Sequence, residues 1–349
     1  MQVVRESVTS DVDVPLKKER DECPPSPSDL GGPGPASPVD VLSSQSTSAA
    51  PRVGAAGPAA EPGATVVAKE DRSSAPAVAS LLADRYVLIN PTDGSSLHKC
   101  IDVVNDREYV CRVVGRDCTG LVSAHFRLDG HPRINSLHEV VLGKDLMYLV
   151  FPESFGDLHL YVRMRKRLRE AEAKRLFRQV AETVKECHDQ GVVLRDLKLR
   201  KFVFSNPERT ELKLENLEDA VVLEDGADDV LQDKRGCPAY VSPEILRSNA
   251  RYSGRAADMW SLGVILYTML VGRYPFNDAE HTNLFVKITR GLFVVPEGLS
   301  SRAKCLIRSL LRRDPSERLT ASDVLIHPWL THEDRCFHAS SSDQVVPDM

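Results

Sequence analysis

The first 80 residues of this 349-residue chain contain no Phe, Tyr or Trp, although they hold 11 of its 22 prolines. Ser, Gly and Ala are abundant in the same stretch. A segment without large apolar side chains cannot bury enough surface to offset the entropy of its chain. Residues 1–80 are therefore predicted to be a disordered Pro/Ser/Gly/Ala-rich region that takes no part in a folded core.

The chain also lacks features that would place it in other protein classes. Its cysteines form no Cys-x-x-Cys pair, and no apolar stretch at the N-terminus is similar to a secretion signal. The longest apolar run, 262–271, is far shorter than the roughly 20 residues that span a bilayer. A net charge of -5 gives no overall attraction to nucleic acid or anionic lipid. We therefore expect a protein of the nucleus and cytoplasm that binds neither membrane nor nucleic acid directly.

A change of apolar periodicity divides the rest of the chain into two lobes. Short β-branched runs bounded by Asp, Gly and Pro predict the strands of a small sheet at 86–89, 109–114 and 147–151. Further on, helical spacing predicts a helix that ends at Gly191, and others at 257–270, 282–290, 301–312 and 320–327. The predicted fold class is α+β, with one folded domain at 84–330 and a flexible tail at 331–349.

Three phrases in the helical half resemble signature motifs of protein kinases. Leu194–Lys198 is similar to the catalytic loop, Ser242–Glu244 to the Ala-Pro-Glu motif, and Asp258–Gly263 to the start of the central helix. Arg318 stands where its equivalent in kinases pairs with Glu244, so Glu244, Asp258 and Arg318 are structural candidates. Because the motifs occur in kinase order within 86–330, we predict a protein-kinase-like two-lobed fold with a small β-rich N-lobe and a larger helical C-lobe.

The parts that hold ATP in a kinase are changed in this sequence. The loop over the phosphates should be rich in glycine, but 90–96 has one glycine together with a proline and an aspartate. Arg112 occupies the strand position of the phosphate-binding lysine, and a planar guanidinium does not replace a compact ammonium. The helical carboxylate that pairs with that lysine would fall near Leu121 or Val122. ATP binding is therefore expected to be weak or absent.

The residues that bind magnesium in kinases are replaced as well. Asn216 stands at the metal-binding position of the segment similar to Asp-Phe-Gly, where it offers a neutral amide in place of a carboxylate. The second ligand position, five residues after Asp196, is Lys201. Asp196 and Lys198 survive, and they leave open a role in holding the loop or a residual catalytic role. We expect no metal, no cofactor and no catalysis; the alternative is a weak, metal-independent ATP-binding kinase.

On these residues the chain resembles the Tribbles pseudokinases. The similar phrases are Leu194–Phe202, Leu214–Asp219, Gly236–Leu246 and Arg273–Phe276. Arg112 departs from the lysine usual in that family, and Asn216 stands where its members often have serine. The resemblance leaves the paralogue open, with a lean towards the third, and it implies a catalytically inactive scaffold.

Two segments are candidates for partner binding by the same resemblance. One, similar to the family's segment for MAP-kinase kinases, consists of Leu325, Ile326, His327, Pro328 and Trp329; a buried His-x-Trp that closes the domain is the alternative. The other is similar to the tail motif that binds the WD40 domain of a constitutive-photomorphogenic-type E3 ubiquitin ligase, and consists of Asp343, Gln344, Val345, Val346, Pro347 and Asp348. An apolar Val-Val-Pro outside the domain has no core to enter, which favours docking to a partner.

The resemblance implies that the protein is an adaptor. The pseudokinase domain would capture a client, a bZIP transcription factor of C/EBP or ATF type, while the tail recruits the RING-type ligase to it. It also implies that a monomer modulates MAP-kinase and Akt signalling. A pure inhibitor of upstream kinases, in which the tail has no part, is the remaining alternative.

Overall fold

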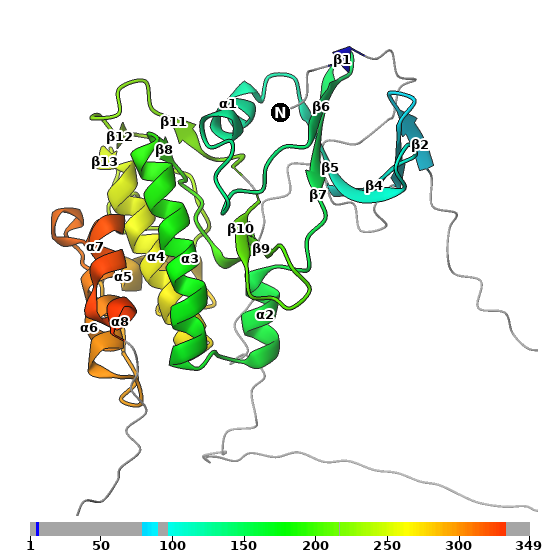
Figure 1. Cartoon of the computed structure of the whole chain (residues 1–349). Helices are drawn as coiled ribbons and strands as arrows, with labels where there is room; N and C mark the ends of the chain where they lie inside the picture. The colour runs from blue at the N-terminus through cyan, green and yellow to red at the C-terminus, as the bar shows by residue number, and fades with distance from the viewer. Residues whose placement is uncertain (1–4, 7–78, 90–96, 216, 333–349) are drawn as a thin grey trace, which may run out of the picture.

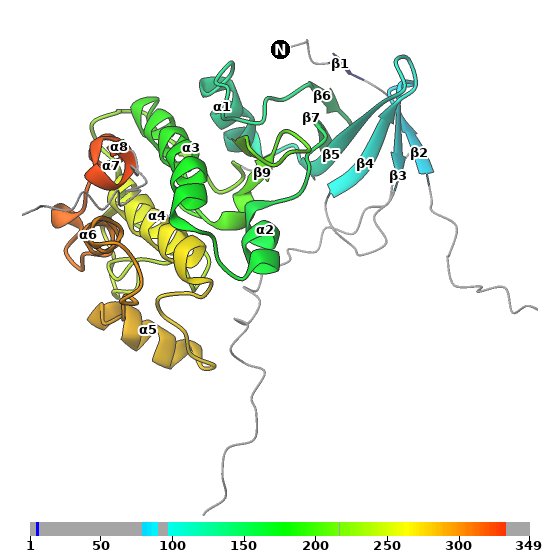
Figure 2. The ribbon, with the colours of Figure 1, turned by 60° about the horizontal axis from the view of Figure 1, so that its bottom comes forward.

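The computed structural model describes residues 5–6, 79–89, 97–215 and 217–332. A curled β-sheet and one helix form the small lobe, and a bundle of helices forms the large lobe beside it (Figures 1 and 2). The sheet has the order β1-β6-β7-β5-β4-β3-β2. Its strands are β1 (Arg5–Glu6), β2 (Ala79–Leu82), β3 (Tyr86–Ile89), β4 (Leu97–Asp102), β5 (Arg107–Gly115), β6 (Glu139–Leu142) and β7 (Leu146–Pro152). Every pair is antiparallel except β1 with β6, which is parallel.

The sheet separates two apolar cores because side chains alternate between its faces. Along β7, Leu149 and Phe151 enter the main core, whereas Tyr148 and Val150 enter a smaller core on the other face. At the edge of the smaller core, Arg85 contacts Asp102 at 2.7 Å and Glu139 at 2.9 Å. The kinase-type N-lobe is thus held by its own core and by an ion-pair cluster.

The large lobe is built around α4, which is buried along most of its length. The helices are α1 (Thr119–Arg127), which packs on the small lobe, α2 (Leu158–Arg165), α3 (Glu170–Asp189), α4 (Gly254–Val271), α5 (His281–Arg290), α6 (Ser301–Leu310), α7 (Ala321–Ile326) and α8 (Pro328–Thr331). A Cβ at Gly263 of α4 would lie 2.8 Å from the Leu310 side chain, so glycine lets α6 approach closely. Within the described part of the chain, no helix combines the length and the apolar character needed to cross a membrane.

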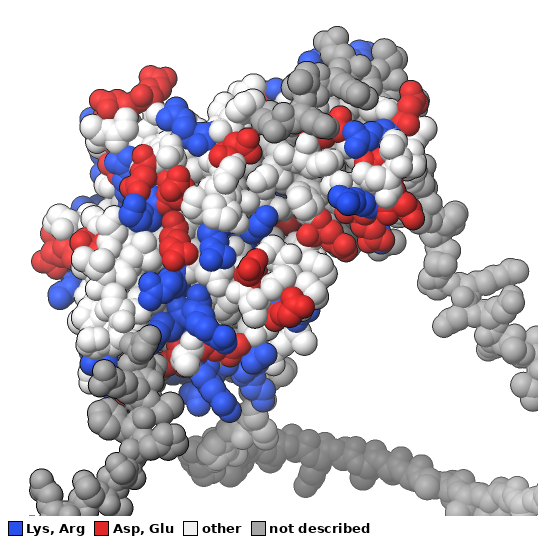
Figure 3. Space-filling view, in the orientation of Figure 1, with Lys and Arg blue, Asp and Glu red and all other residues white. Residues whose placement is uncertain are grey.

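Short strands and turns connect these helices and carry the motif loops. They are β8 (Val192–Val193), η2 (Leu199–Lys201), β9 (Phe202–Phe204), β10 (Leu212–Leu214), β11 (Val221–Val222), β12 (Val230–Leu231), β13 (Tyr252–Ser253) and η3 (Pro315–Glu317). On the face shown in Figure 3, Lys and Arg side chains gather over the N-terminal part of α3 and its joint with α2.

The structure confirms the predicted kinase fold class and differs from the sequence reading at several boundaries. Strand β2 begins at Ala79, ahead of the domain boundary that we placed at residue 84. It forms a hairpin with β3 through Ala83 and Asp84, which both have a positive φ. Strand β1 and the start of β2 fall within 1–80, the range expected to be disordered; the rest of that range lies outside the described residues. Helix α6 ends at Leu310, two residues before the expected end.

Candidate functional site

The loop that resembles the kinase catalytic loop is held by Asp258 of α4. The Asp258 carboxylate accepts hydrogen bonds from the backbone N–H of Leu194 at 2.8 Å and of Arg195 at 2.9 Å. It also lies 3.0 Å from Nε2 of His188 in α3. Arg195 adopts a left-handed conformation, with φ of 60°. One buried carboxylate therefore holds the backbone of this loop.

Asp196 lies at the centre of a cluster of two carboxylates and two lysines. Its carboxylate accepts a hydrogen bond from the backbone N–H of Cys237 at 3.0 Å. Nζ of Lys198 lies 2.9 Å from Asp196, and Nζ of Lys201 lies 3.4 Å from it. Lys201 also contacts Asp219 at 3.0 Å. Both lysines are buried, so the charges of the cluster cancel within the protein.

Lys201 supplies, inside this cluster, the positive charge that a metal ion would bring. Burial alone would raise the pKa of Asp219, but Lys201, Lys198 and Arg195 together hold that pKa below its usual value. The Asp219 carboxylate is therefore ionised and already neutralised. Across the described residues, no group of three or more His, Cys, Asp or Glu side chains is arranged to hold a metal ion. Asn216, the other expected departure, lies outside the described residues.

Arg112 of β5 is engaged by a carboxylate that the sequence reading did not assign to it. Its Nη1 lies 3.1 Å from Oε2 of Glu218, in the segment after β10. The expected helical position holds Leu121, which is buried in the core, and Val122, which packs against it. Arg112 thus pairs with the segment that would carry the magnesium ligand in a kinase.

Helix α1 contributes a buried neutral histidine near Arg112. His125 of α1 lies with its ring 5.3 Å from that of Phe151, and neither ring nitrogen has a hydrogen-bond partner in the described structure. Burial and the nearby positive charge of Arg112 lower the pKa of His125 to about 4. The ring therefore stays uncharged at neutral pH and acts as part of the apolar packing behind Arg112.

Two ion pairs fix the segment between β11 and α4. Arg195 pairs with Asp233, whose backbone carbonyl also accepts a hydrogen bond from the Tyr252 hydroxyl at 2.8 Å. Glu244 and Arg318 form a buried bidentate pair, with distances of 2.6 and 2.8 Å. The structure thus places Glu244, Asp258 and Arg318 in contacts that hold backbone segments together.

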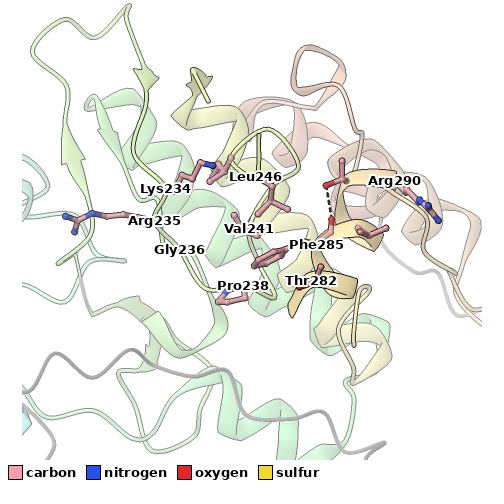
Figure 4. Close-up of a pocket in the computed structure, with 12 residues that line it drawn as sticks. Lys234, Arg235, Gly236, Pro238, Val241, Leu246, Thr282, Phe285 and Arg290 are labelled. Atoms are coloured by element: carbon pink, nitrogen blue, oxygen red, sulfur yellow. Dashed lines mark hydrogen bonds between the residues drawn. The ribbon is translucent and has the colours of Figure 1, made fainter. Parts of the chain in front are cut away.

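An apolar groove lies between this segment and α5 (Figure 4). Thr282 and Phe285 of α5 lie opposite Pro238 and Val241 of the segment, and the cavity measures about 650 Å³. Basic side chains stand among its lining residues: Lys234, Arg235 and Arg290. The sequence reading missed this groove, because its two walls lie about 45 residues apart in the chain and the wall on α5 carries no motif.

The segment expected to bind MAP-kinase kinases is largely engaged inside the domain. Trp329 is 2% exposed and donates from Nε1 to Glu170 at 3.0 Å. Nδ1 of His327 accepts a hydrogen bond from the Trp329 backbone at 3.1 Å, and Pro328 begins α8. Leu325 packs against the core, whereas Ile326 is 72% exposed. Ile326 and Pro328 are thus the apolar members of the segment that a partner can reach.

The expected tail motif, Asp343 to Asp348, lies outside the described residues. The last described turn is nevertheless attached to α3: the backbone carbonyls of Leu330 and His332 accept hydrogen bonds from Arg178 and Lys174. The chain therefore leaves the domain from a fixed point beside α3.

Comparison with known proteins identifies relatives over most of the chain. The family described as Protein kinase domain matches residues 98–330. Tribbles homolog 2 from Bos taurus is 53% identical over 274 residues, which cover 76% of this chain and 79% of that protein. Tribbles homolog 3 from Rattus norvegicus is 50% identical over 297 residues, covering 82% and 84%. Tribbles homolog 1 from Homo sapiens is 50% identical over 274 residues, covering 77% and 73%. These similar identities do not distinguish the paralogues.

Proposed function

Because the chain belongs to the Tribbles family of proteins with a protein kinase domain, we propose that it is a pseudokinase adaptor that recruits a RING-type E3 ubiquitin ligase to client proteins. The observation that carries the proposal is the position of Lys201 between Asp196 and Asp219. Phosphoryl transfer depends on metal ions that neutralise the developing charge. A lysine among the carboxylates opposes the entry of magnesium, so this cluster favours a scaffold over an enzyme.

The apolar groove beside α5 supports a role in capturing a client. Its apolar lining and the basic side chains of Lys234, Arg235 and Arg290 suit an apolar segment that carries acidic residues. We propose transcription factors of the C/EBP or ATF bZIP type as clients. MAP-kinase kinases and Akt are further proposed partners, and Ile326 is the exposed candidate for the first of these. A monomer that acts in nucleus and cytoplasm fits this role.

The tail supports the second half of the proposal. Its candidate motif, 343–348, follows the fixed exit at His332 by about ten residues, which is a short tether. A short tether holds the ligase near a captured client and raises its effective concentration there. The WD40 domain of a constitutive-photomorphogenic-type ligase is the proposed receptor.

Calorimetry with the purified full-length chain and the ligase WD40 domain tests the adaptor role. We expect micromolar-range binding that disappears in a Val346→Ala/Pro347→Ala variant. A matched Ser340→Ala/Ser341→Ala variant changes the same tail outside the motif and should bind as the parent does. Absence of binding by the parent, or equal binding by all three proteins, would contradict the proposal.

The alternative of a weak kinase rests on Asp196 and Lys198, which keep the residue types of a catalytic loop. A thermal-unfolding series with ATP, in the presence and absence of magnesium, separates it from the adaptor role. A ligand at 100 times its Kd stabilises a protein by about 2.7 kcal/mol, so a binding nucleotide would shift the Tm by degrees. We expect no magnesium-dependent shift. The inhibitor alternative is tested by deleting 343–349, because a pure inhibitor of upstream kinases would keep its effect.

A further inference from the structure

The joint between α2 and α3 carries a concentrated positive charge that the adaptor role does not use. Five basic residues occur within 163–169, and no acidic residue stands between them. All five are exposed, and they form what we call the basic loop: Arg163, Arg165, Lys166, Arg167 and Arg169. Figure 3 shows basic side chains gathered over this joint.

Most of this charge is not compensated locally. Glu172 accepts a hydrogen bond from the Tyr161 hydroxyl at 2.6 Å and pairs with Arg165 at 3.3 Å. Glu170 is occupied by Ser300 and Trp329. The remaining four cations of the basic loop have no side-chain ion pair or hydrogen bond to any described residue. Clustered like charges repel one another, so an anionic partner would relieve that repulsion.

The backbone of the basic loop is fixed, so its charges project from a preorganised frame. Leu168 is buried and donates from its backbone N–H to the Met269 carbonyl at 2.8 Å. Lys166, which follows the last residue of α2, has a positive φ of 64°. A Cβ at Gly272 would lie 1.8 Å from the Lys166 carbonyl oxygen, so the loop is seated closely against the end of α4. A non-glycine residue held in this conformation by tertiary packing is a common feature of binding sites.

Exposed apolar side chains lie on the helix that leads into the loop. Leu160 is 46% exposed and Met164 is 69% exposed. The two are four residues apart in α2, so they lie on the same helical face. Methionine is well suited to adaptable binding surfaces because its side chain is flexible and polarizable. The joint therefore presents an apolar strip beside its cations.

We propose that the basic loop, with Leu160 and Met164, is a docking surface for an acidic segment of a partner protein. Four of the five cations are arginines, whose guanidinium groups bind carboxylates in a bidentate manner. An apolar side chain of the same segment would contact Met164. The surface shares no residue with the groove beside α5 or with the tail, so its occupant is an additional partner.

A protein segment fits this surface better than a nucleic acid or a membrane. The seven-residue loop is small, whereas both of those ligands present phosphates over a wide area. The rest of the chain opposes such polyanions, because the net charge is -5 and the isoelectric point is about 6.1. A short acidic segment contacts the loop without meeting this wider negative charge.

Fluorescence anisotropy with the full-length chain tests the proposal. The probe is a labelled peptide of six glutamates and two leucines, and a matched peptide with glutamine in place of glutamate is its control. We expect the acidic peptide to bind more tightly than its control, and its affinity to fall as salt screens the charges. An Arg163→Glu/Arg167→Glu variant should bind at least about tenfold more weakly, because attraction becomes repulsion.

An Arg107→Glu/Lys144→Glu variant reverses two exposed charges in the small lobe and should bind as the parent does. An Arg163→Gln/Arg167→Gln variant should have intermediate affinity, and its Tm should match that of the parent because both side chains are exposed. Equal binding by parent and Arg163→Glu/Arg167→Glu would overturn the proposal. So would no binding of the acidic peptide, or binding of phosphatidylserine vesicles or duplex DNA in its place.

Discussion

Replacement of Lys201 by methionine removes one of the two buried cations of the cluster while keeping an unbranched side chain of similar length. Nζ of Lys201 lies 3.0 Å from Asp219 and 3.4 Å from Asp196, and its side chain is 7% exposed. Loss of one partner from a buried ion pair costs about 3–5 kcal/mol, because the other charge remains buried. Lys198 still contacts Asp196 at 2.9 Å, and the Asp219 side chain is 30% exposed. Because of this remaining compensation we expect a loss below that range, about 2–3 kcal/mol.

Urea denaturation at pH 7, followed by circular dichroism, measures this loss in the free energy of unfolding. Lys213→Met is the matched control: Lys213 lies on β10, is partly exposed and has no ion pair to a described residue. The control should change stability by less than about 0.5 kcal/mol. Equal stability of the Lys201→Met and Lys213→Met variants would refute the view that the cluster depends on an internal cation.

The same variant has a second signature at acid pH. The pKa of Asp219 in the folded protein lies below the ordinary value of 3.8, so the stabilisation it provides is present above that value and is lost as the pH falls through the lowered pKa. The difference in stability between the parent and Lys201→Met should therefore be constant near neutral pH and shrink at pH values below 3.8. A difference that does not change with pH would mean that lost packing, and not lost charge, causes the destabilisation.

Three further substitutions test the frame of the site. The pKa of His125 in the folded protein, about 4, lies below the ordinary 6.5, so the parent should lose about 1.4 kcal/mol of unfolding free energy per pH unit as the pH falls from 6.5 towards 4. His125→Leu removes this titrating group and should reduce that pH dependence, which urea denaturation at several pH values measures. Glu244→Gln leaves Arg318 buried without its charged partner and should cost about 3–5 kcal/mol, seen as a lower Tm by calorimetry. Gly272→Ala places a Cβ 1.8 Å from the Lys166 carbonyl oxygen at a residue with a φ of 81°. The free energy of unfolding, measured with urea, should fall by at least about 2 kcal/mol. Gly120→Ala is the control, because a Cβ at Gly120 has no neighbour within 4 Å, and it should show no such loss.

The fold could be predicted from the sequence because several motifs occur in kinase order, and each is tied to a particular place in that fold. Strand β4 was missed because Leu97–Asp102 mixes His98, Lys99 and Asp102 with apolar residues; His98 and Asp102 are buried only once β3 and β5 pair on either side. Helix α2 was missed because Leu160 and Met164 face solvent, so the apolar periodicity is weak.

The site was predictable only where a residue could be counted from a motif. Lys201 follows Asp196 by five positions, so its departure from the kinase pattern was visible in the sequence. Its contact with Asp219 was not visible, because the two residues are brought together by the pairing of β9 with β10. No fixed number of residues in the sequence marks such a contact. The same holds for Arg112 and Glu218, which are 106 residues apart. These ion pairs are tertiary contacts. The positions at which the sequence differs from the kinase pattern indicated only one partner of each pair.

The contact between Arg195 and Asp233 has a consequence for how the protein is controlled. In many kinases the segment after the cleft becomes ordered when a phosphorylated residue pairs with an arginine, so an upstream enzyme sets the state of the molecule. Here the carboxylate belongs to the chain itself and is present from the moment of folding. The position of this segment at Arg195 therefore does not depend on the addition of a phosphate.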